Sequence, residues 1–128
     1  MHCQLRSPER TLFDGEATLV AAHSMEGEFA VMTGHAPLLA ALDTAPLRIK
    51  TDDGERVFAV DSGVLRVSAD GVMILAQEAI AVEEIDLAAV KARRVEIEQE
   101  LAEAEEKDLL QRELALLRVE ERVVKDHA

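Results

Sequence analysis

The sequence predicts a mainly β protein of the α+β class, in which an N-terminal antiparallel β-sandwich precedes a C-terminal two-helix hairpin. Three observations support this prediction. Up to about residue 82 the chain consists of short runs in which apolar and polar residues alternate, as they do along a β-strand. No helical segment separates these runs, which is typical of antiparallel sandwiches and barrels. From residue 86 onward Gly and Pro are absent, and apolar residues recur at helical spacing.

Eight runs in the first part of the chain indicate strands. They span residues 4–6, 18–22, 28–32, 47–50, 56–61, 64–67, 72–76 and 79–82. Turns are expected at Asp14-Gly15, Glu26-Gly27, Asp53-Gly54, Ser62-Gly63 and Asp70-Gly71, because Gly adopts positive φ without a steric penalty. The change of pattern near Asp86 predicts two domains, residues 1–83 and 84–128.

Two apolar stripes indicate the two helices. Asp86 is expected to cap the first helix, because its carboxylate can accept hydrogen bonds from free backbone N–H groups. The stripes consist of Leu87, Val90, Ile97, Leu101 and Ala104, and of Leu110, Leu114, Leu117 and Val124. The segment 103–108 between them is mostly charged and contains no helix breaker. The helices can therefore fold back as a hairpin or straighten into one long helix.

The composition excludes several classes of function. A formal net charge of −12 repels phosphate backbones, and an aromatic content of 2% leaves few rings for base stacking, so no nucleic acid is expected as a partner. The longest apolar run, residues 36–42, is far shorter than the roughly 20 residues of a membrane span, so no direct membrane insertion is expected. The single Cys3 fits a reducing compartment, and no secretory leader is recognised.

Residues that carry chemistry are scattered along the chain. The histidines at positions 2, 23, 35 and 127 lack a second ligand at metal-binding spacing, so no metal site is expected. Cys3 has no neighbouring base, and we expect a small buried residue rather than a nucleophile. The sequence contains neither a phosphate-binding glycine loop nor a nucleophile elbow. We therefore expect no catalytic residues and no enzyme activity.

The stretch EGEFAVMTGHAPLLAAL, residues 26–42, differs from the other runs. It opens as a strand, bends at Gly34 and continues through His35 and Pro37 into an apolar run. Three interpretations follow from these residues alone. The stretch is the mouth of an active site, a turn into a core strand, or a surface that binds another protein.

Several segments together resemble the epsilon subunit of bacterial F-type ATP synthase. They are Gly27-Glu28-Phe29, Gly34-His35-Ala36-Pro37-Leu38-Leu39, the residues 61–67 and 72–76, and Ile85-Asp86. The resemblance covers essentially the whole chain, and the Gly-His-Ala-Pro-Leu-Leu segment is its most specific part. The family's Ser-Gly-Gly type of turn is represented here by Ser62-Gly63-Val64, a small departure.

The resemblance implies a sandwich of about ten strands in a non-catalytic subunit of the central stalk. In that family the sandwich binds the gamma subunit and rests on the ring of c subunits, which it couples in proton-driven ATP synthesis. The C-terminal helices permit turnover when folded down, and they inhibit ATP hydrolysis when they extend into the alpha/beta catalytic hexamer. The implied location is peripheral, on the cytoplasmic face of the bacterial cell membrane.

The resemblance also assigns contact residues in the 26–42 stretch. Glu28 resembles the acidic residue that meets the polar loops of the c ring, and Gly34 and His35 belong to the same contact surface for the c ring and gamma. The alternative for Glu28 is a bystander on the surface. The alternative for Gly34 and His35 is a tight turn that only shapes the backbone.

Three arginines of the second helix are the expected contacts with the catalytic hexamer. They are Arg112, Arg118 and Arg122. The alternative is that they pair along a solvated helix face, Arg118 with Glu121 and Arg122 with Asp126, where ion pairs contribute little to stability.

Some members of the resembled family bind ATP on the helical hairpin. Asp86, Arg118 and Arg122 match parts of that site, whereas Ile80, Ala89, Val90 and Glu96 depart from it. The missing arginine removes a planar multi-donor group and Glu96 adds negative charge, so we expect weak or absent ATP binding and no cofactor. Two alternatives to a rotor subunit are an ATP-sensing regulatory module and a free-standing adaptor that binds an unrelated protein.

Overall fold

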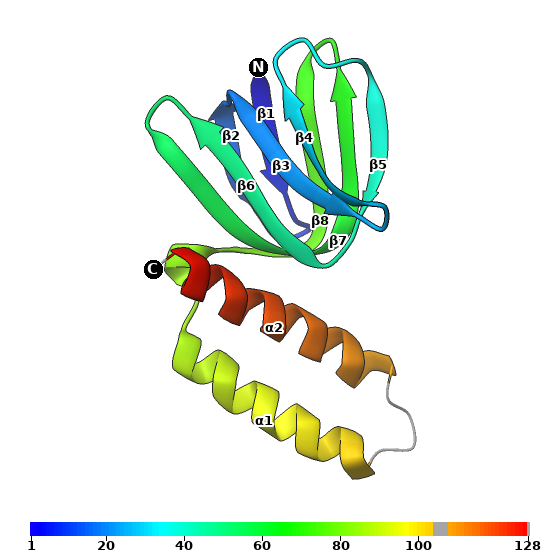
Figure 1. The fold of residues 1–128 in the computed structure, drawn as a ribbon, viewed down its shortest axis with the longest axis vertical. Helices are drawn as coiled ribbons and strands as arrows, with labels where there is room; N and C mark the ends of the chain where they lie inside the picture. Colours follow the sequence, from blue (N-terminus) through cyan, green and yellow to red (C-terminus); the bar gives the residue numbers. More distant parts are fainter. Residues whose placement is uncertain (104–107, 128) are drawn as a thin grey trace.

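The computed structural model describes residues 1–103 and 108–127. Its elements are β1 (His2–Arg6), β2 (Thr11–Glu16), β3 (Leu19–Ser24), β4 (Gly27–Met32), β5 (Leu38–Leu42), β6 (Ala45–Thr51), β7 (Gly54–Ser68), β8 (Gly71–Ala81), the 3₁₀ helix η1 (Val82–Glu84), α1 (Leu87–Glu103) and α2 (Asp108–His127). Figure 1 shows the strands gathered in a sandwich, with α2 lying between the sandwich and α1. The predicted fold class, a mainly β sandwich followed by two helices, is confirmed.

The sheet is continuous and folds back on itself. Its strand order is β2-β1-β8-β7-β5-β3-β4, and β6 bridges β3 and β7. Among the described strands, β1 pairs with β8 in parallel, and the other pairs are antiparallel. The prediction of an antiparallel sandwich therefore holds except at this one pair.

The described residues contain eight strands rather than about ten, because two long strands replace four short ones. Residues 56–61 and 64–67 belong to β7, and residues 72–76 and 79–82 fall on β8 and its junction with η1. The alternation of apolar and polar residues is interrupted within both strands, because the positions that face the core change from even-numbered to odd-numbered residues. On β7, Phe58 and Val60 face the core before the bend, whereas Leu65 and Val67 face it afterwards. The bend lies at Ser62 and Gly63, so this pair is not a turn between strands.

Two strands were not expected from the sequence. Asp14-Gly15 lies within β2, where Gly15 pairs with Cys3, and is not the expected turn. β5 occupies the end of the apolar run, and its side chains alternate between partly buried Leu38 and exposed Leu39. An unbroken apolar run hides this alternation. Only the side of β5 that carries Leu38 and Leu42 packs against the core, so the interpretation as a turn into a core strand holds for that side alone.

The main core lies between the two layers of the sandwich. Its largest fully buried side chains include Phe58, Leu5, Leu47, Ile49 and Leu65. Cys3 belongs to this core and is 0% exposed, as expected for a small buried residue. Burial raises the pKa of its thiol to about 12, so the nucleophilic thiolate is not populated at neutral pH.

The helices pack as a hairpin against the outside of the sandwich. Asp86 caps α1, since its Oδ1 accepts a hydrogen bond from Ala89 N at 3.2 Å. Val90 and Ile97 of α1 pack against Leu114 and Leu117 of α2. The segment 104–107, with the expected Ala104 and the absence of a helix breaker, lies outside the described residues.

Helix α2 has a second apolar face, which covers one corner of the sandwich. Val123 is 2% exposed and packs with Val57, Ala59 and Val82, and Val119 and Val124 lie at the edge of this cluster. This contact buries Val123, which lies beside the stripe expected for the second helix. The stripes of α1 and α2 therefore pack against each other, and α2 also packs against the sandwich.

Candidate functional site

The 26–42 stretch forms β4, the loop that follows it and β5, and β4 pairs with β3 as a hairpin. Gly34 has a φ of 86°, a left-handed conformation that favours glycine. It closes a turn in which His35 N donates to Met32 O at 3.0 Å. The His35 ring donates from Nδ1 to its neighbour's carbonyl, Ala36 O, at 2.6 Å, which leaves Nε2 for a partner.

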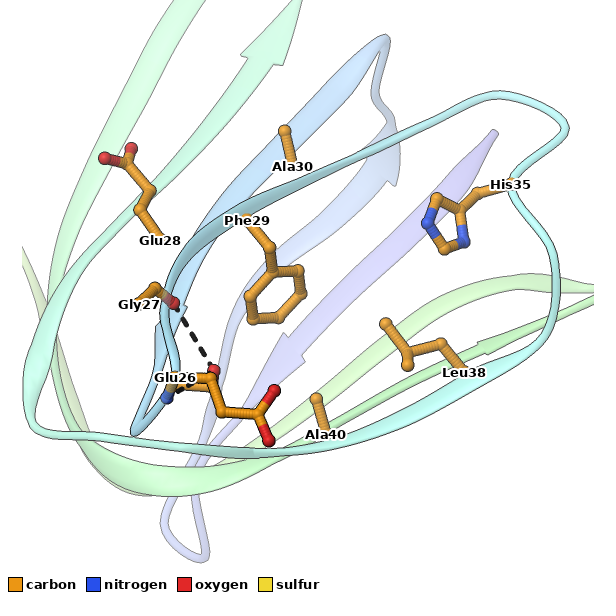
Figure 2. Close-up of a pocket in the computed structure, with 9 residues that line it drawn as sticks. Glu26, Gly27, Glu28, Phe29, Ala30, His35, Leu38 and Ala40 are labelled. Atoms are coloured by element: carbon orange, nitrogen blue, oxygen red, sulfur yellow. Dashed lines mark hydrogen bonds between the residues drawn. The ribbon is translucent and has the colours of Figure 1, made fainter.

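A shallow cavity of about 390 Å³ lies beside this loop. It is lined by Ser24, Glu26, Gly27, Glu28, Phe29, Ala30, His35, Leu38 and Ala40. In Figure 2 the rings of Phe29 and His35 point towards this space, together with Leu38. The Glu28 carboxylate points away from them, because neighbouring residues on a strand face opposite sides. The structure therefore brings His35 and Phe29 together and directs Glu28 to a different face.

Glu28 remains exposed on β4, where it is paired in register with His23 of β3. The tip of the same hairpin carries Met25, which is 90% exposed, and Met32 at the other end of β4 is 59% exposed. An exposed carboxylate flanked by exposed methionines suits a protein contact better than catalysis. The interpretation as an active-site mouth finds no cluster of catalytic groups here among the described residues.

A second surface, which sequence reasoning missed, lies on the outer face of β5, β7 and β8. Ala41, Val64 and Leu75 form one cross-strand row, since Ala41 pairs with Val64 and Val64 pairs with Leu75. Leu39 lies in the next row, opposite Arg66. Leu39, Val64 and Leu75 are 71%, 42% and 52% exposed. We call these four apolar residues the outer row; the alternation of Leu39 against Leu38 was the signal that could have revealed it.

The arginines of α2 lie on its exposed face. Arg118 is 3.7 Å from Glu98 of α1, and Arg122 is 3.6 Å from Asp126. Of the two ion pairs named in the alternative interpretation, Arg122–Asp126 is present, whereas Arg118 contacts Glu98 in place of Glu121. Glu121 instead lies 2.8 Å from Arg94 Nε of α1, and this position across the hairpin could not be read from α2 alone. Arg112 is also exposed.

A larger cleft of about 780 Å³ opens between the start of α1 and the end of α2. Its lining consists of Leu87, Lys91, Arg94, Glu121, Arg122, Val124, Lys125 and Asp126. Of the three residues that match an ATP site, only Arg122 lines this cleft. Asp86 is engaged as the cap of α1, and Arg118 is paired outside it. The Arg93 guanidinium is bound by Glu113, at 2.8 Å and 3.1 Å, and is not directed at the cleft.

Comparison with known proteins identifies the family to which the sandwich belongs. Residues 1–82 match the family model described as ATP synthase, Delta/Epsilon chain, beta-sandwich domain. The chain belongs to the ATP synthase epsilon-chain family. The resemblance found in the sequence is therefore confirmed, and in this family the epsilon chain is a non-catalytic subunit.

The match extends into the helices in several bacterial relatives. The ATP synthase epsilon chain of Brevibacillus brevis is 40% identical over 104 residues, covering 80% of this chain and 79% of the relative. That of Streptomyces avermitilis is 41% identical over 106 residues, covering 82% of each. The epsilon chain of Rhodococcus jostii is 47% identical over 94 residues, covering 72% and 77%.

A solved structure has the same fold at low sequence identity. A chain in the mitochondrial ATP synthase of Euglena gracilis, described as OSCP/F1/c-ring in rotational state 1, has a TM-score of 0.78 and 23% identity. The similarity covers 98% of this chain and 80% of that one. No described helix of the present chain is long and apolar enough to cross a membrane.

Proposed function

We propose that this chain is the central-stalk subunit that links gamma to the c ring, and that its hairpin regulates ATP hydrolysis. The observation that carries the proposal is the outer row. An epsilon-family sandwich needs a surface for a permanent partner, and three large apolar side chains of this row are exposed on a regular sheet face. Monomeric proteins seldom expose a contiguous apolar patch without a binding role.

The outer row is the proposed gamma-binding surface. At its other end β7 runs beneath α2, where Val57 and Ala59 are buried by the helix. Beyond the bend at Gly63, Val64 and Leu75 have no such cover among the described residues. Burial of an exposed leucine in an interface contributes about 1.5–3 kcal/mol before the costs of association, so this row is large enough to anchor a partner.

The hairpin end of the sandwich is the proposed c-ring contact. Glu28 supplies an exposed carboxylate on β4, and Met25 supplies apolar area at the β3–β4 tip. The turn held by Gly34 and the His35 hydrogen bonds fixes the neighbouring loop. A fixed loop loses little entropy on binding, which favours affinity for the polar loops of the c subunits.

The hairpin described here is in its folded-down arrangement, which the proposal assigns to turnover. In the inhibiting arrangement α2 leaves the sandwich and Arg112, Arg118 and Arg122 meet acidic segments of the alpha/beta hexamer. The proposed location follows from these partners: peripheral, on the cytoplasmic face of the membrane that holds the c ring.

The test is copurification with gamma. Leu39→Asp places a charge in the outer row and is expected to weaken gamma binding at least about tenfold, the scale of an interface anchor. Val95→Asp is the matched control, because Val95 is 47% exposed on α1, away from the sandwich. Equal gamma binding by the two variants would remove the outer row from the interface. If the wild-type chain recruits an unrelated protein and no gamma, the free-standing adaptor is the better description.

A further inference from the structure

Acidic side chains gather at the seam between α2 and the sandwich. A cavity of about 240 Å³ at this seam is lined by Glu9, Arg10, Ala59, Glu78, Ala79, Ile80, Leu116 and Glu120. Glu120 comes from α2 and is partly buried there, whereas Glu78 comes from β8. The two carboxylates therefore face one cavity from opposite sides of the docking contact, beside the apolar cluster around Val123.

The charged groups around Glu120 are mostly acidic or already paired. Asp61 lies opposite Glu78 in the β7–β8 register, and its Oδ1 accepts a hydrogen bond from Thr44 at 2.9 Å. The nearest basic group in the cavity is Arg10, whose guanidinium is held by Glu84 at 2.8 Å and 3.5 Å. Several other charged groups on α2 and on the elements packed against it are engaged elsewhere: Arg48 with Glu55, Arg56 over the Phe58 ring, Arg118 with Glu98, Glu121 with Arg94 and Arg122 with Asp126.

An ionised Glu120 is unfavourable in this place for two reasons. Docking takes its carboxylate partly out of water, which penalises the charge, and brings it towards the like charge of Glu78. Both penalties disappear when α2 leaves the sandwich. Among the described residues, no Lys, Arg or His nitrogen lies within 4.0 Å of this carboxylate to offset them.

We propose that Glu120 makes the docking of the hairpin pH-sensitive: its neutral carboxyl holds α2 on the sandwich, and its ionised form, facing Glu78, loosens it. Burial first, and then the charge of Glu78, raises the pKa of Glu120 above the ordinary glutamate range. The docked state therefore binds the proton more tightly than the released state. Docking is strongest below the ordinary glutamate pKa and weakens as the pH rises through the raised pKa.

The switch itself depends only on this chain. Its effect on ATP hydrolysis rests on the proposed function, in which a released hairpin inhibits. Under that proposal an alkaline shift favours inhibition and an acid shift favours turnover.

The test measures docking in the full-length isolated chain by energy transfer between two dyes. Cysteines replace Ala69, in the β7–β8 turn, and Ala115, on α2. Both alanines are exposed, so the dyes need no buried space, and both are uncharged, so no native charge is lost. The buried Cys3 is replaced by Ala so that only the two new thiols react. Between about pH 8 and about pH 5, above and near the ordinary glutamate pKa, the docking constant is expected to rise at least about fivefold, the lower end of usual coupling energies.

Three glutamine variants test whether Glu120 is the group that makes docking depend on pH. Glu120→Gln is expected to be tightly docked at both pH values, and Glu78→Gln to dock more tightly than wild type at the higher pH. Glu100→Gln, which removes an exposed carboxylate from α1, is the matched control and should keep the wild-type pH dependence. A wild-type docking constant that does not change with pH, or a Glu120→Gln variant that retains the full change, overturns the proposal. A pH switch in the isolated chain without a matching change in hydrolysis by the assembled enzyme would leave the switch standing and contradict the inhibitory role of the hairpin.

Discussion

At the scale of single residues, Gly63 determines whether β7 can bend against β8. A Cβ built on Gly63 would lie 2.2 Å from the carbonyl oxygen of Leu75, a distance that real Cβ atoms do not reach. The residue before it, Ser62, already has a φ of 44°. The bend sends the second half of β7 to pair with β5, so this glycine also positions the outer row.

We predict that Gly63→Ala lowers the free energy of unfolding by about 2 kcal/mol, because the strands must separate locally to admit the methyl group. Gly15→Ala is the matched control. The new Cβ at that position would lie 3.7 Å from the Phe13 ring, an ordinary contact, so its effect should stay within about 0.5 kcal/mol. Urea denaturation of both variants measures the difference. Equal stabilities would mean that the strands yield at no cost.

At the scale of elements, α2 is held to the sandwich by a small apolar contact. Val123 is the centre of this contact, and we predict that Val123→Asp releases the hairpin while the sandwich stays folded. Burying an unpaired carboxylate costs far more than the contact contributes. Leu109→Asp is the control, since Leu109 is 79% exposed on the same helix.

Hydrogen exchange resolves the two parts of the chain in these variants. In Val123→Asp the amides of α2 should lose protection, and those of β7 and β8 should keep it. In Leu109→Asp both sets should exchange as in the wild-type chain. Loss of protection throughout Val123→Asp would show that the hairpin and the sandwich unfold as one unit.

We also predict weak or absent binding of Mg-ATP to the helical hairpin. In the cleft between the helix ends, Arg94 is paired with Glu121 and Glu98, and the Glu121 carboxylate itself lines the space. An incoming polyphosphate would have to displace these carboxylates and approach a chain with a net charge of −12. Calorimetric titration of the isolated chain measures this. Micromolar affinity that disappears in an Arg118→Ala, Arg122→Ala double variant would contradict the prediction.

The features of these elements that depend on neighbouring residues could be predicted from the sequence, and those that depend on tertiary contacts could not. The Asp86 cap and the helical spacing of Val90 and Ile97 depend on neighbouring residues, so they could be predicted. The joining of four short runs into β7 and β8 depends on a bend shared by two strands. The Arg94–Glu121 pair depends on how two helices are placed side by side. Such features arise from tertiary contacts, which no single run of sequence encodes.

At the scale of the whole molecule, the sandwich and the hairpin have separate cores joined by a modest contact. We predict that a fragment of residues 1–83 folds and still binds gamma, because the sandwich core and the outer row lie entirely within it. The fragment should be somewhat less soluble than the full chain, since Val57 and Ala59 lose the cover of α2. Circular dichroism and copurification with gamma measure the two properties. A fragment that folds but does not bind gamma would place the docking surface in the helices.

The regulatory half of the proposal is tested by removing the hairpin from the assembled enzyme. We predict that deletion of the residues after Glu84 raises ATP hydrolysis, because the deleted segment contains all three arginines proposed to contact the catalytic hexamer. The cut follows η1, so it preserves the Arg10–Glu84 ion pair on the sandwich. A full-length enzyme with Arg112, Arg118 and Arg122 changed to Ala tests whether the arginines themselves cause the inhibition. These side chains are exposed, and the exposed Arg118–Glu98 pair contributes little to stability, so the docked hairpin should stay folded. Hydrolysis should rise in both enzymes if the arginines hold the extended helix in place. A rise on deletion alone would show that the hairpin inhibits through other contacts, and no rise in either enzyme would contradict a regulatory role for this chain.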